Sequence, residues 1–159
     1  MSWVLPAGTP EEQSWAMTAA APQAGVRILL VEDDGANRAL VRAVLARSAD
    51  PELRGACIVE AGDLAQARTA LTGPPVDVVL LDMGLPDGNG LELAAELRNT
   101  PDGRPPAVVA VTGGTGPGQA HEAIAAGCRE VLTKPYAAAD LCDVLAAALR
   151  ADRAAPDAG

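Results

Sequence analysis

Residues 76–90 read Val-Asp-Val-Val-Leu-Leu-Asp-Met-Gly-Leu-Pro-Asp-Gly-Asn-Gly, and this stretch decides the fold. Its first six residues form a β-branched and leucine run, which predicts a buried strand over 76–81. The glycines and the proline that follow Asp82 predict a tight loop at the end of that strand. Open α/β sheets place ligands beyond the carboxyl ends of their strands, so Asp82 is a candidate site residue.

Similar apolar runs alternate with helical patterns along the rest of the chain. The predicted strands are 26–31, 56–61, 76–81, 107–112 and 130–133. The predicted helices run from 34 or 35 to about 48, 63 to 71, 90 to 99, about 119 to 126, and 139 or 140 to about 152. Asp50-Pro51 is expected to end the first helix. This alternation predicts an α/β domain with a parallel sheet and right-handed crossovers.

The ends of the chain do not follow this pattern. We expect an N-terminal extension over 1–25, the domain over 26–152 and a disordered tail over 153–159. Thr9-Pro10-Glu11-Glu12 has the features of a helix start. Two interpretations of the extension stay open: a short helix from Pro10 to about Ala21 anchored by Trp15, or a disordered segment that is helical only in part.

Composition excludes several classes of function. The formal net charge is −9, with 12 basic against 21 acidic residues, which disfavours nucleic acid and anionic membrane surfaces as partners. Cys57, Cys128 and Cys142 are odd in number and widely spaced, as expected for free thiols in a reducing cytosol. No secretory signal or membrane-length apolar run occurs, so we expect a cytoplasmic protein.

Polar residues follow several of the predicted strands, and parallel strands end at the same edge of a sheet. Glu32 and Asp33 follow the first strand, Asp82 the third, Thr112 ends the fourth, and Lys134 follows the fifth. Mg²⁺ takes oxygen ligands and usually one or two carboxylates, so these acids predict a magnesium site. Lys134 could neutralise a phosphoryl oxygen and Thr112 could donate its hydroxyl. Asp82 is a possible nucleophile for phosphoryl transfer.

Four motifs, each after a predicted strand, resemble the receiver domain of two-component response regulators, the CheY-like superfamily. They are Ile28-Leu29-Leu30-Val31-Glu32-Asp33-Asp34, Leu80-Leu81-Asp82-Met83-Gly84-Leu85-Pro86-Asp87-Gly88-Asn89-Gly90, Val111-Thr112-Gly113 and Leu132-Thr133-Lys134-Pro135-Tyr136. The resemblance covers residues 26–150. It implies a flavodoxin-like, doubly wound, five-stranded parallel sheet of order 2-1-3-4-5 with helices on both faces.

The resemblance also implies roles for the site residues. Asp82 would accept a phosphoryl group from a phosphohistidine on a sensor histidine kinase or a histidine phosphotransfer protein. Glu32, Asp33, Asp82 and the backbone carbonyl of Gly84 would bind Mg²⁺ (or Mn²⁺). Thr112 and Lys134 would contact the phosphoryl group, and Lys134–Pro135 would be a cis peptide. A downstream protein would bind the face formed by the fourth helix, fifth strand and fifth helix.

Some positions depart from the family pattern. Val131 stands where the family often has Tyr or Phe, so the usual aromatic switch cannot operate. Gly84 and Gly114 carry no side chains, which predicts an open site. The glycine-rich loop 113–118 is expected to be mobile, with a frayed start to the fourth helix. It lacks the Gly-Lys-Ser/Thr ending of a nucleotide-binding loop.

Several interpretations compete at the level of function. We expect a phosphoacceptor receiver without an output domain, either a stand-alone phosphorelay carrier or a module of a hybrid kinase. Such a protein is not a conventional enzyme, because it promotes only its own Mg²⁺-dependent phosphorylation and dephosphorylation. The alternative is a receiver-like interaction module that is not phosphorylated. A phosphohydrolase ranks last, because Gly84 stands where such enzymes need a second carboxylate. Asp87 and Asn89 are interpreted as loop residues that tolerate left-handed conformations, and His121 as a solvated side chain.

Overall fold

A five-stranded parallel sheet forms the centre of the molecule. The structure, a computed structural model, describes residues 25–99, 105–113 and 117–154. The strands lie in the order β2-β1-β3-β6-β7. This confirms the predicted order 2-1-3-4-5, since β6 and β7 are the fourth and fifth strands of this sheet. Their bounds are β1 Arg27–Val31, β2 Cys57–Ala61, β3 Val78–Asp82, β6 Ala107–Thr112 and β7 Glu130–Thr133.

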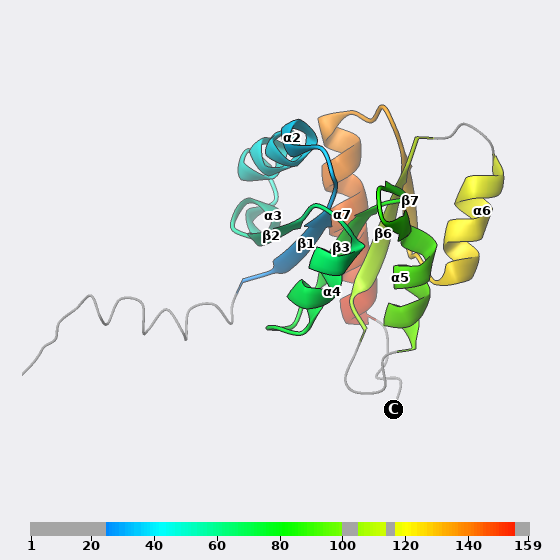
Figure 1. The fold of residues 1–159 in the computed structure, drawn as a ribbon. Coiled ribbons are helices and arrows are strands. Elements are labelled where there is room, and N and C mark those ends of the chain that lie inside the picture. The colour runs from blue at the N-terminus through cyan, green and yellow to red at the C-terminus, as the bar shows by residue number, and fades with distance from the viewer. Residues whose placement is uncertain (1–24, 100–104, 114–116, 155–159) are drawn as a thin grey trace, which may run out of the picture.

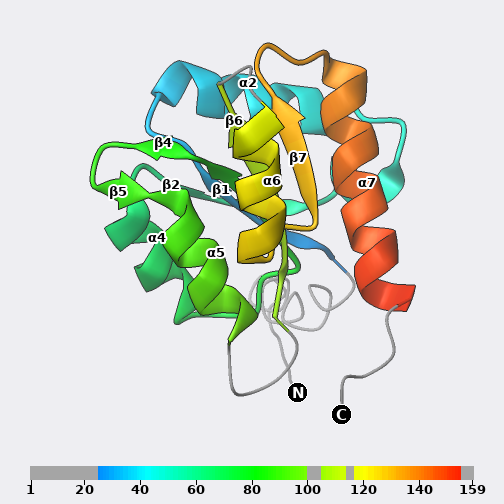
Figure 2. The ribbon, with the colours of Figure 1, turned by 90° about the vertical axis from the view of Figure 1, so that its right-hand side faces the viewer.

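Helices cover both faces of the sheet, as predicted (Figures 1 and 2). The helices α2 (Gly35–Ala46), α3 (Pro51–Arg54) and α7 (Ala138–Ala154) lie on one face. The helices α4 (Leu64–Leu71), α5 (Gly90–Arg98) and α6 (Pro117–Ala126) lie on the other. Successive side chains of a strand point to opposite faces, so Ile28 and Leu30 pack under α2 and α7, whereas Leu29 and Val31 pack under α4 and α5.

Four of the helices have an Asp or Asn residue as their N-cap. Asp34 caps α2, Asp50 caps α3, Asp63 caps α4 and Asn89 caps α5. Each side chain accepts a hydrogen bond from a main-chain N–H group of the first helical turn, which would otherwise lack a partner. These caps set where the chain turns from strand to helix, and so fix the loops that carry the candidate site.

Three predictions about local structure were wrong. Pro51 does not merely follow a helix end: α2 ends at Ala46, and Pro51 begins the short helix α3, a position that suits its fixed φ. The helix α6 begins at Pro117 instead of about 119. Asn89 is not left-handed, since its φ is −96° as the N-cap of α5.

The loop after Asp82 contains a small antiparallel hairpin that the sequence did not predict. It pairs β4 (Gly84–Leu85) with β5 (Gly88–Asn89). Gly88 has a φ of +152°, which side-chain-bearing residues rarely adopt. The Asp87 carboxylate accepts hydrogen bonds from the N–H groups of Leu64 and Ala65, at 2.9 and 3.1 Å. The hairpin is therefore attached to the start of α4, and Asp87 has a structural role.

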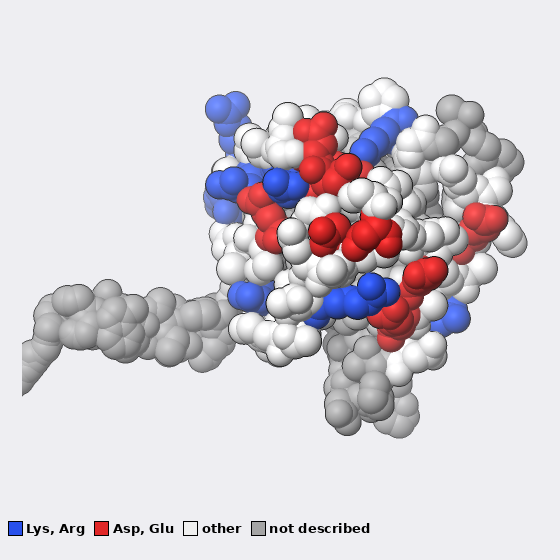
Figure 3. All heavy atoms as spheres, in the orientation of Figure 1, with Lys and Arg blue, Asp and Glu red and all other residues white. Residues whose placement is uncertain are grey.

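Residues 1–24, 100–104, 114–116 and 155–159 lie outside the described residues. The predicted tail over 153–159 begins too early, because α7 continues to Ala154. The extension, the rest of the tail and the mobility of the loop at 114–116 stay predictions. Within the parts of the chain that the structure describes, no helix has the length and apolar character needed to cross a membrane. On the face drawn in Figure 3, acidic side chains are interspersed with Lys and Arg, and the basic side chains do not form one continuous patch.

Candidate functional site

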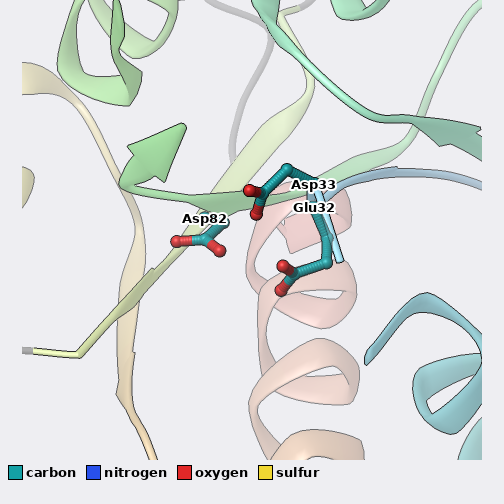
Figure 4. Close-up of side chains that lie close together, drawn as sticks. All are labelled: Glu32, Asp33 and Asp82. Carbon is teal, nitrogen blue, oxygen red and sulfur yellow. The ribbon is translucent and has the colours of Figure 1, made fainter. Parts of the chain in front are cut away.

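Three carboxylates meet at the carboxyl edge of the sheet. Glu32 and Asp33 directly follow β1, and Asp82 is the last residue of the neighbouring strand β3. One oxygen atom from each of these three residues lies within 4.8 Å of the other two. In Figure 4 the three side chains reach a shared space from two strand ends. Glu32 and Asp82 are buried, and Asp33 is exposed, so the cluster opens to solvent on one side.

Lys134 supplies the positive charge of this cluster. Its Nζ lies 3.2 Å from Asp82 Oδ2 and 3.4 Å from Glu32 Oε1. Lys134 is the only lysine in the sequence. Its main-chain N–H donates to the carbonyl oxygen of Thr112 at 2.8 Å, and the peptide to Pro135 is cis, as the resemblance implied. Two strand ends thus hold the ammonium group against the acids.

Main-chain and side-chain donors fix the orientation of the buried acids. The N–H of Gly84 donates to Asp82 Oδ1 at 2.9 Å, and the N–H of Asp34 donates to Glu32 Oε2 at 3.1 Å. Arg38, on α2, donates from Nη1 to the carbonyl oxygen of Glu32 at 2.7 Å and from Nε to Glu60 at 3.0 Å. The loop that carries Glu32 and Asp33 is therefore held from β2 and α2 as well as from β1.

The electrostatics show an excess of negative charge. Burial raises the pKa of Glu32, and the nearby charge of Asp82 adds to that rise, although the Asp34 N–H and Lys134 oppose it. For Lys134, burial lowers the pKa, but the hydrogen bonds and charges of Asp82 and Glu32 outweigh burial and raise it. One ammonium thus faces three carboxylates. Hard oxygen donors in such an arrangement suit a divalent cation such as Mg²⁺.

The remaining predicted site residues lie beside this cluster. Thr112 is 3% exposed at the end of β6, next to β3, where Asp82 pairs with Val111. It lines a cavity of ≈ 130 Å³ together with Met83, Asn89, Leu91, Gln119 and Glu122. Gly84 contacts Asp82 through its amide, and the metal-binding role of its carbonyl stays a prediction. The structure thus brings Glu32, Asp33, Asp82, Gly84 and Lys134 together and places Thr112 adjacent to them.

Sequence reasoning missed two residues that hold the site. Arg38 fixes the main chain at Glu32, and Asp87 fixes the loop that follows Asp82. Neither has a local sequence signal, because Arg38 bonds to a main-chain carbonyl and Asp87 bonds to N–H groups more than twenty positions earlier. His121 is exposed, as predicted, and Tyr136 is half-buried against the core under α2 and α7.

The fold and this site identify the class of protein. Residues 28–146 match the response regulator receiver domain family. The chain belongs to this family, whose members take part in two-component signalling with sensor histidine kinases. Phosphorylation and Mg²⁺ binding at an acidic pocket are properties of the family, and receiver domains are not conventional enzymes.

Individual relatives carry the receiver in larger proteins. The chain is 31% identical over 130 residues to the cyclic di-GMP phosphodiesterase response regulator RpfG of Xanthomonas campestris, covering 82% of this chain and 33% of the relative. It is 32% identical over 134 residues to the response regulator MprA of a Mycobacterium species, covering 84% of this chain and 54% of the relative. The chain thus spans a third to about half of these relatives.

Solved structures show the same fold. The signal receiver domain of a putative Luxo repressor protein from Vibrio parahaemolyticus superposes with a TM-score of 0.72 at 22% identity, covering 81% of this chain and 93% of that one. The beryllofluoride-activated NtrC4 receiver domain dimer superposes with a TM-score of 0.68 at 26% identity, covering 79% and 98%.

Proposed function

We propose that this chain is a phosphoacceptor, with Asp82 taking a phosphoryl group from a phosphohistidine on a sensor histidine kinase or a histidine phosphotransfer protein. One observation carries the proposal: three carboxylates lie within 4.8 Å of one another, with the ammonium of Lys134 3.2 Å from Asp82. This set supplies a nucleophile, oxygen donors for a cation and a positive charge for phosphoryl oxygens. It can do so only because two adjacent strands end at the same edge.

The transfer itself requires little covalent chemistry from the protein. A carboxylate oxygen of Asp82 forms a bond to phosphorus, the phosphorus–nitrogen bond of phosphohistidine breaks, and the imidazole nitrogen keeps the electron pair. The product is an acyl phosphate. Catalysis is therefore mainly positioning and charge neutralisation. Glu32, Asp33, Asp82 and the Gly84 carbonyl would hold Mg²⁺, which when bound would neutralise part of the charge on the phosphoryl oxygens.

Lys134 and Thr112 would respond to the new group. Lys134 pairs with Asp82 Oδ2, and phosphorylation of Asp82 would remove the carboxylate charge on which this pair depends. The ammonium would then pair with a phosphoryl oxygen, to which its compact charge is suited. Thr112 lies on the adjacent strand and would donate its hydroxyl to the same group. Both residues would therefore carry the change from the site into β6 and β7.

A downstream protein would read this change on the face formed by α6, β7 and α7. Two features support this face. The side chain of Ile124 on α6 is 51% exposed, which offers an apolar contact. Lys134 follows β7 directly, and its N–H bonds to Thr112 at the end of β6. Phosphorylation would shift an equilibrium between two states of this face that differ by a few kcal/mol.

The experiment is incubation with acetyl phosphate and Mg²⁺, followed by intact-mass measurement. We expect one added phosphoryl group, lost with Asp82→Asn and after magnesium chelation. Asp143→Asn, which removes an exposed acid on α7, is the matched control and keeps the adduct. An adduct that persists in Asp82→Asn rules out Asp82 as acceptor. Wild-type protein that takes up no phosphoryl group and shows no Mg²⁺ binding by calorimetry would instead be a non-phosphorylated interaction module.

A further inference from the structure

A groove runs between α2 and α7, on the sheet face opposite to α4, α5 and α6. Its volume is ≈ 660 Å³, and it is lined in part by aliphatic side chains and a thiol, namely Leu40, Val44, Ala139, Cys142 and Ala146. Leu40 is 57% exposed. Among the residues that the structure describes, Leu40 and Ile124 are the large hydrophobic side chains left exposed, and Leu40 alone lies in this groove.

We propose that the chain's own residues 1–24 cover this groove, with Trp15 as the side chain that enters it. The proposal is independent of phosphorylation. It concerns an intramolecular contact between the N-terminal segment and the surface formed by α2 and α7.

The position at which the segment joins the domain favours this face. Val26 is 4% exposed and belongs to the same buried cluster as Val41, Leu45 and Leu149, which lies beneath α2 and α7. The segment therefore leaves the domain at the layer that carries the groove. Trp15 precedes Gly25 by ten positions. Ten residues span at most about 36 Å, and a domain of this size has a radius of gyration of roughly 14 Å, so Trp15 can reach the groove.

The composition of the segment matches an apolar cover. Both tryptophans of the chain, Trp3 and Trp15, lie in it. Tryptophan carries a large apolar surface, and its burial is favourable even when one edge stays in contact with water.

The charges that line the groove do not oppose this contact. The segment contains Glu11 and Glu12, and the first basic residue of the chain is Arg27. The groove is balanced: Arg47 and Arg150 line it together with Asp50 and Asp143. The carboxylate of Asp50 already accepts the N–H of Glu52 at 2.9 Å.

The covalent link makes a single anchoring side chain sufficient. Docking of a tethered segment is an intramolecular event, with an effective concentration on the order of millimolar for a short flexible link. A separate peptide or protein would need a larger complementary surface to occupy the groove to the same extent.

Tryptophan fluorescence tests this contact in the full-length chain, because residues 25–159 contain no tryptophan. Trp3→Phe leaves Trp15 as the only reporter. We expect its emission to lie at shorter wavelength than in the denatured chain, and acrylamide quenching to be reduced severalfold. In the same background, Leu40→Asp and Ala43→Glu, both at exposed positions of α2, should return emission and quenching to the values of a solvated tryptophan.

Ile124→Asp is the matched control, because it makes the same change of charge at the exposed leucine-sized side chain on α6. It should leave Trp15 unaffected. Circular dichroism and the denaturation midpoint confirm that each variant folds. A solvated Trp15 in the parent chain, or a protected Trp15 that persists in both groove variants, overturns the proposal. Protection that grows with protein concentration alongside dimer formation in sedimentation assigns the groove to a second copy and also overturns it.

Discussion

Replacing Lys134 by methionine should destabilise the domain, because it leaves two buried carboxylates facing each other. The side chains of Glu32 and Asp82 are 8% and 10% exposed, and Lys134 Nζ lies 3.4 and 3.2 Å from them. Breaking a fully buried ion pair by removing one partner costs about 3–5 kcal/mol. The Lys134 side chain is 32% exposed, so solvent screens the pair, and we expect a loss of about 2 kcal/mol in the free energy of unfolding.

The loss should depend on pH in a direction that follows from Glu32. Its pKa in the folded protein is raised above the ordinary value of 4.5, first by burial and then by Asp82. At pH values between the ordinary pKa of Glu32 and its raised pKa in the folded protein, the folded state binds more protons than the unfolded state. The free energy of unfolding therefore falls as the pH rises through this range. The charge of Lys134 lowers the pKa of Glu32, so without Lys134 the pKa of Glu32 in the folded protein is higher and this pH range reaches higher values. The deficit of Lys134→Met should therefore be larger at pH 8 than at pH 5.

Urea denaturation followed by circular dichroism measures this deficit at both pH values. Arg42→Met is the matched control, because the Arg42 side chain is 57% exposed and pairs with Glu60 at 3.1 Å on the surface. Such a pair contributes about 0–1 kcal/mol. A Lys134→Met variant as stable as the wild type at pH 8, or one with its larger deficit at pH 5, would refute the reasoning.

Two further predictions concern single side chains. Asp87→Ala removes the acceptor of two N–H groups at the start of α4, so the denaturation midpoint should fall and amide exchange at Leu64 and Ala65 should accelerate. Those hydrogen bonds, the Leu64 bond foremost, lower the pKa of Asp87, so this deficit should fade as the pH drops below 3.8. Burial raises the pKa of Cys128 to about 11, so a thiol reagent at pH 8 should label exposed Cys57 and spare Cys128 until the protein unfolds. The same shift predicts that stability falls as the pH rises from 9.0 to about 11, since the unfolded thiol ionises first.

Local patterns were sufficient to predict the strands of the sheet, but not their order. Each strand of the sheet is a short apolar run, and the strand is buried on both faces where helices cover it, as for Val78–Asp82. The acids and the lysine follow strands directly, so a parallel sheet must bring them to one edge. The strand order came from the resemblance, because periodicity alone does not specify which strands are neighbours.

The contacts that were not predicted join side chains to main-chain groups. Asp87 bonds to the N–H groups of residues 22 and 23 positions earlier, and this contact accompanies the hairpin after Asp82. Arg38 bonds to a main-chain carbonyl, which has no sequence signature at all. At Pro51 the local signal was ambiguous, because proline after an acidic residue marks a chain break and also a helix start. In the structure Pro51 begins α3, with Asp50 as the N-cap.

Val131 occupies the position at which the family often has Tyr or Phe. It lies in β7 opposite Ala110 and packs, half-buried, against the core under α4, α5 and α6. Valine has no ring that could change orientation at this position, and its β-branched side chain is itself restricted at χ1. The main chain provides another route: Thr112 pairs with Thr133, and its carbonyl accepts the N–H of Lys134 at 2.8 Å. A shift of Thr112 therefore moves the end of β7 as well.

This route predicts the behaviour of Val131→Ala. If the proposed phosphorylation of Asp82 is transmitted through the main chain, amide exchange at the ends of β6 and β7 should change on phosphorylation in the variant as it does in the wild type. Val131→Ala should lower stability only by the loss of part of an aliphatic contact, about 1 kcal/mol. A variant that is phosphorylated normally but no longer changes exchange at 112 and 134 would show that the Val131 side chain carries the signal. The hydrogen bond between Thr112 and Lys134 would then be a structural contact alone.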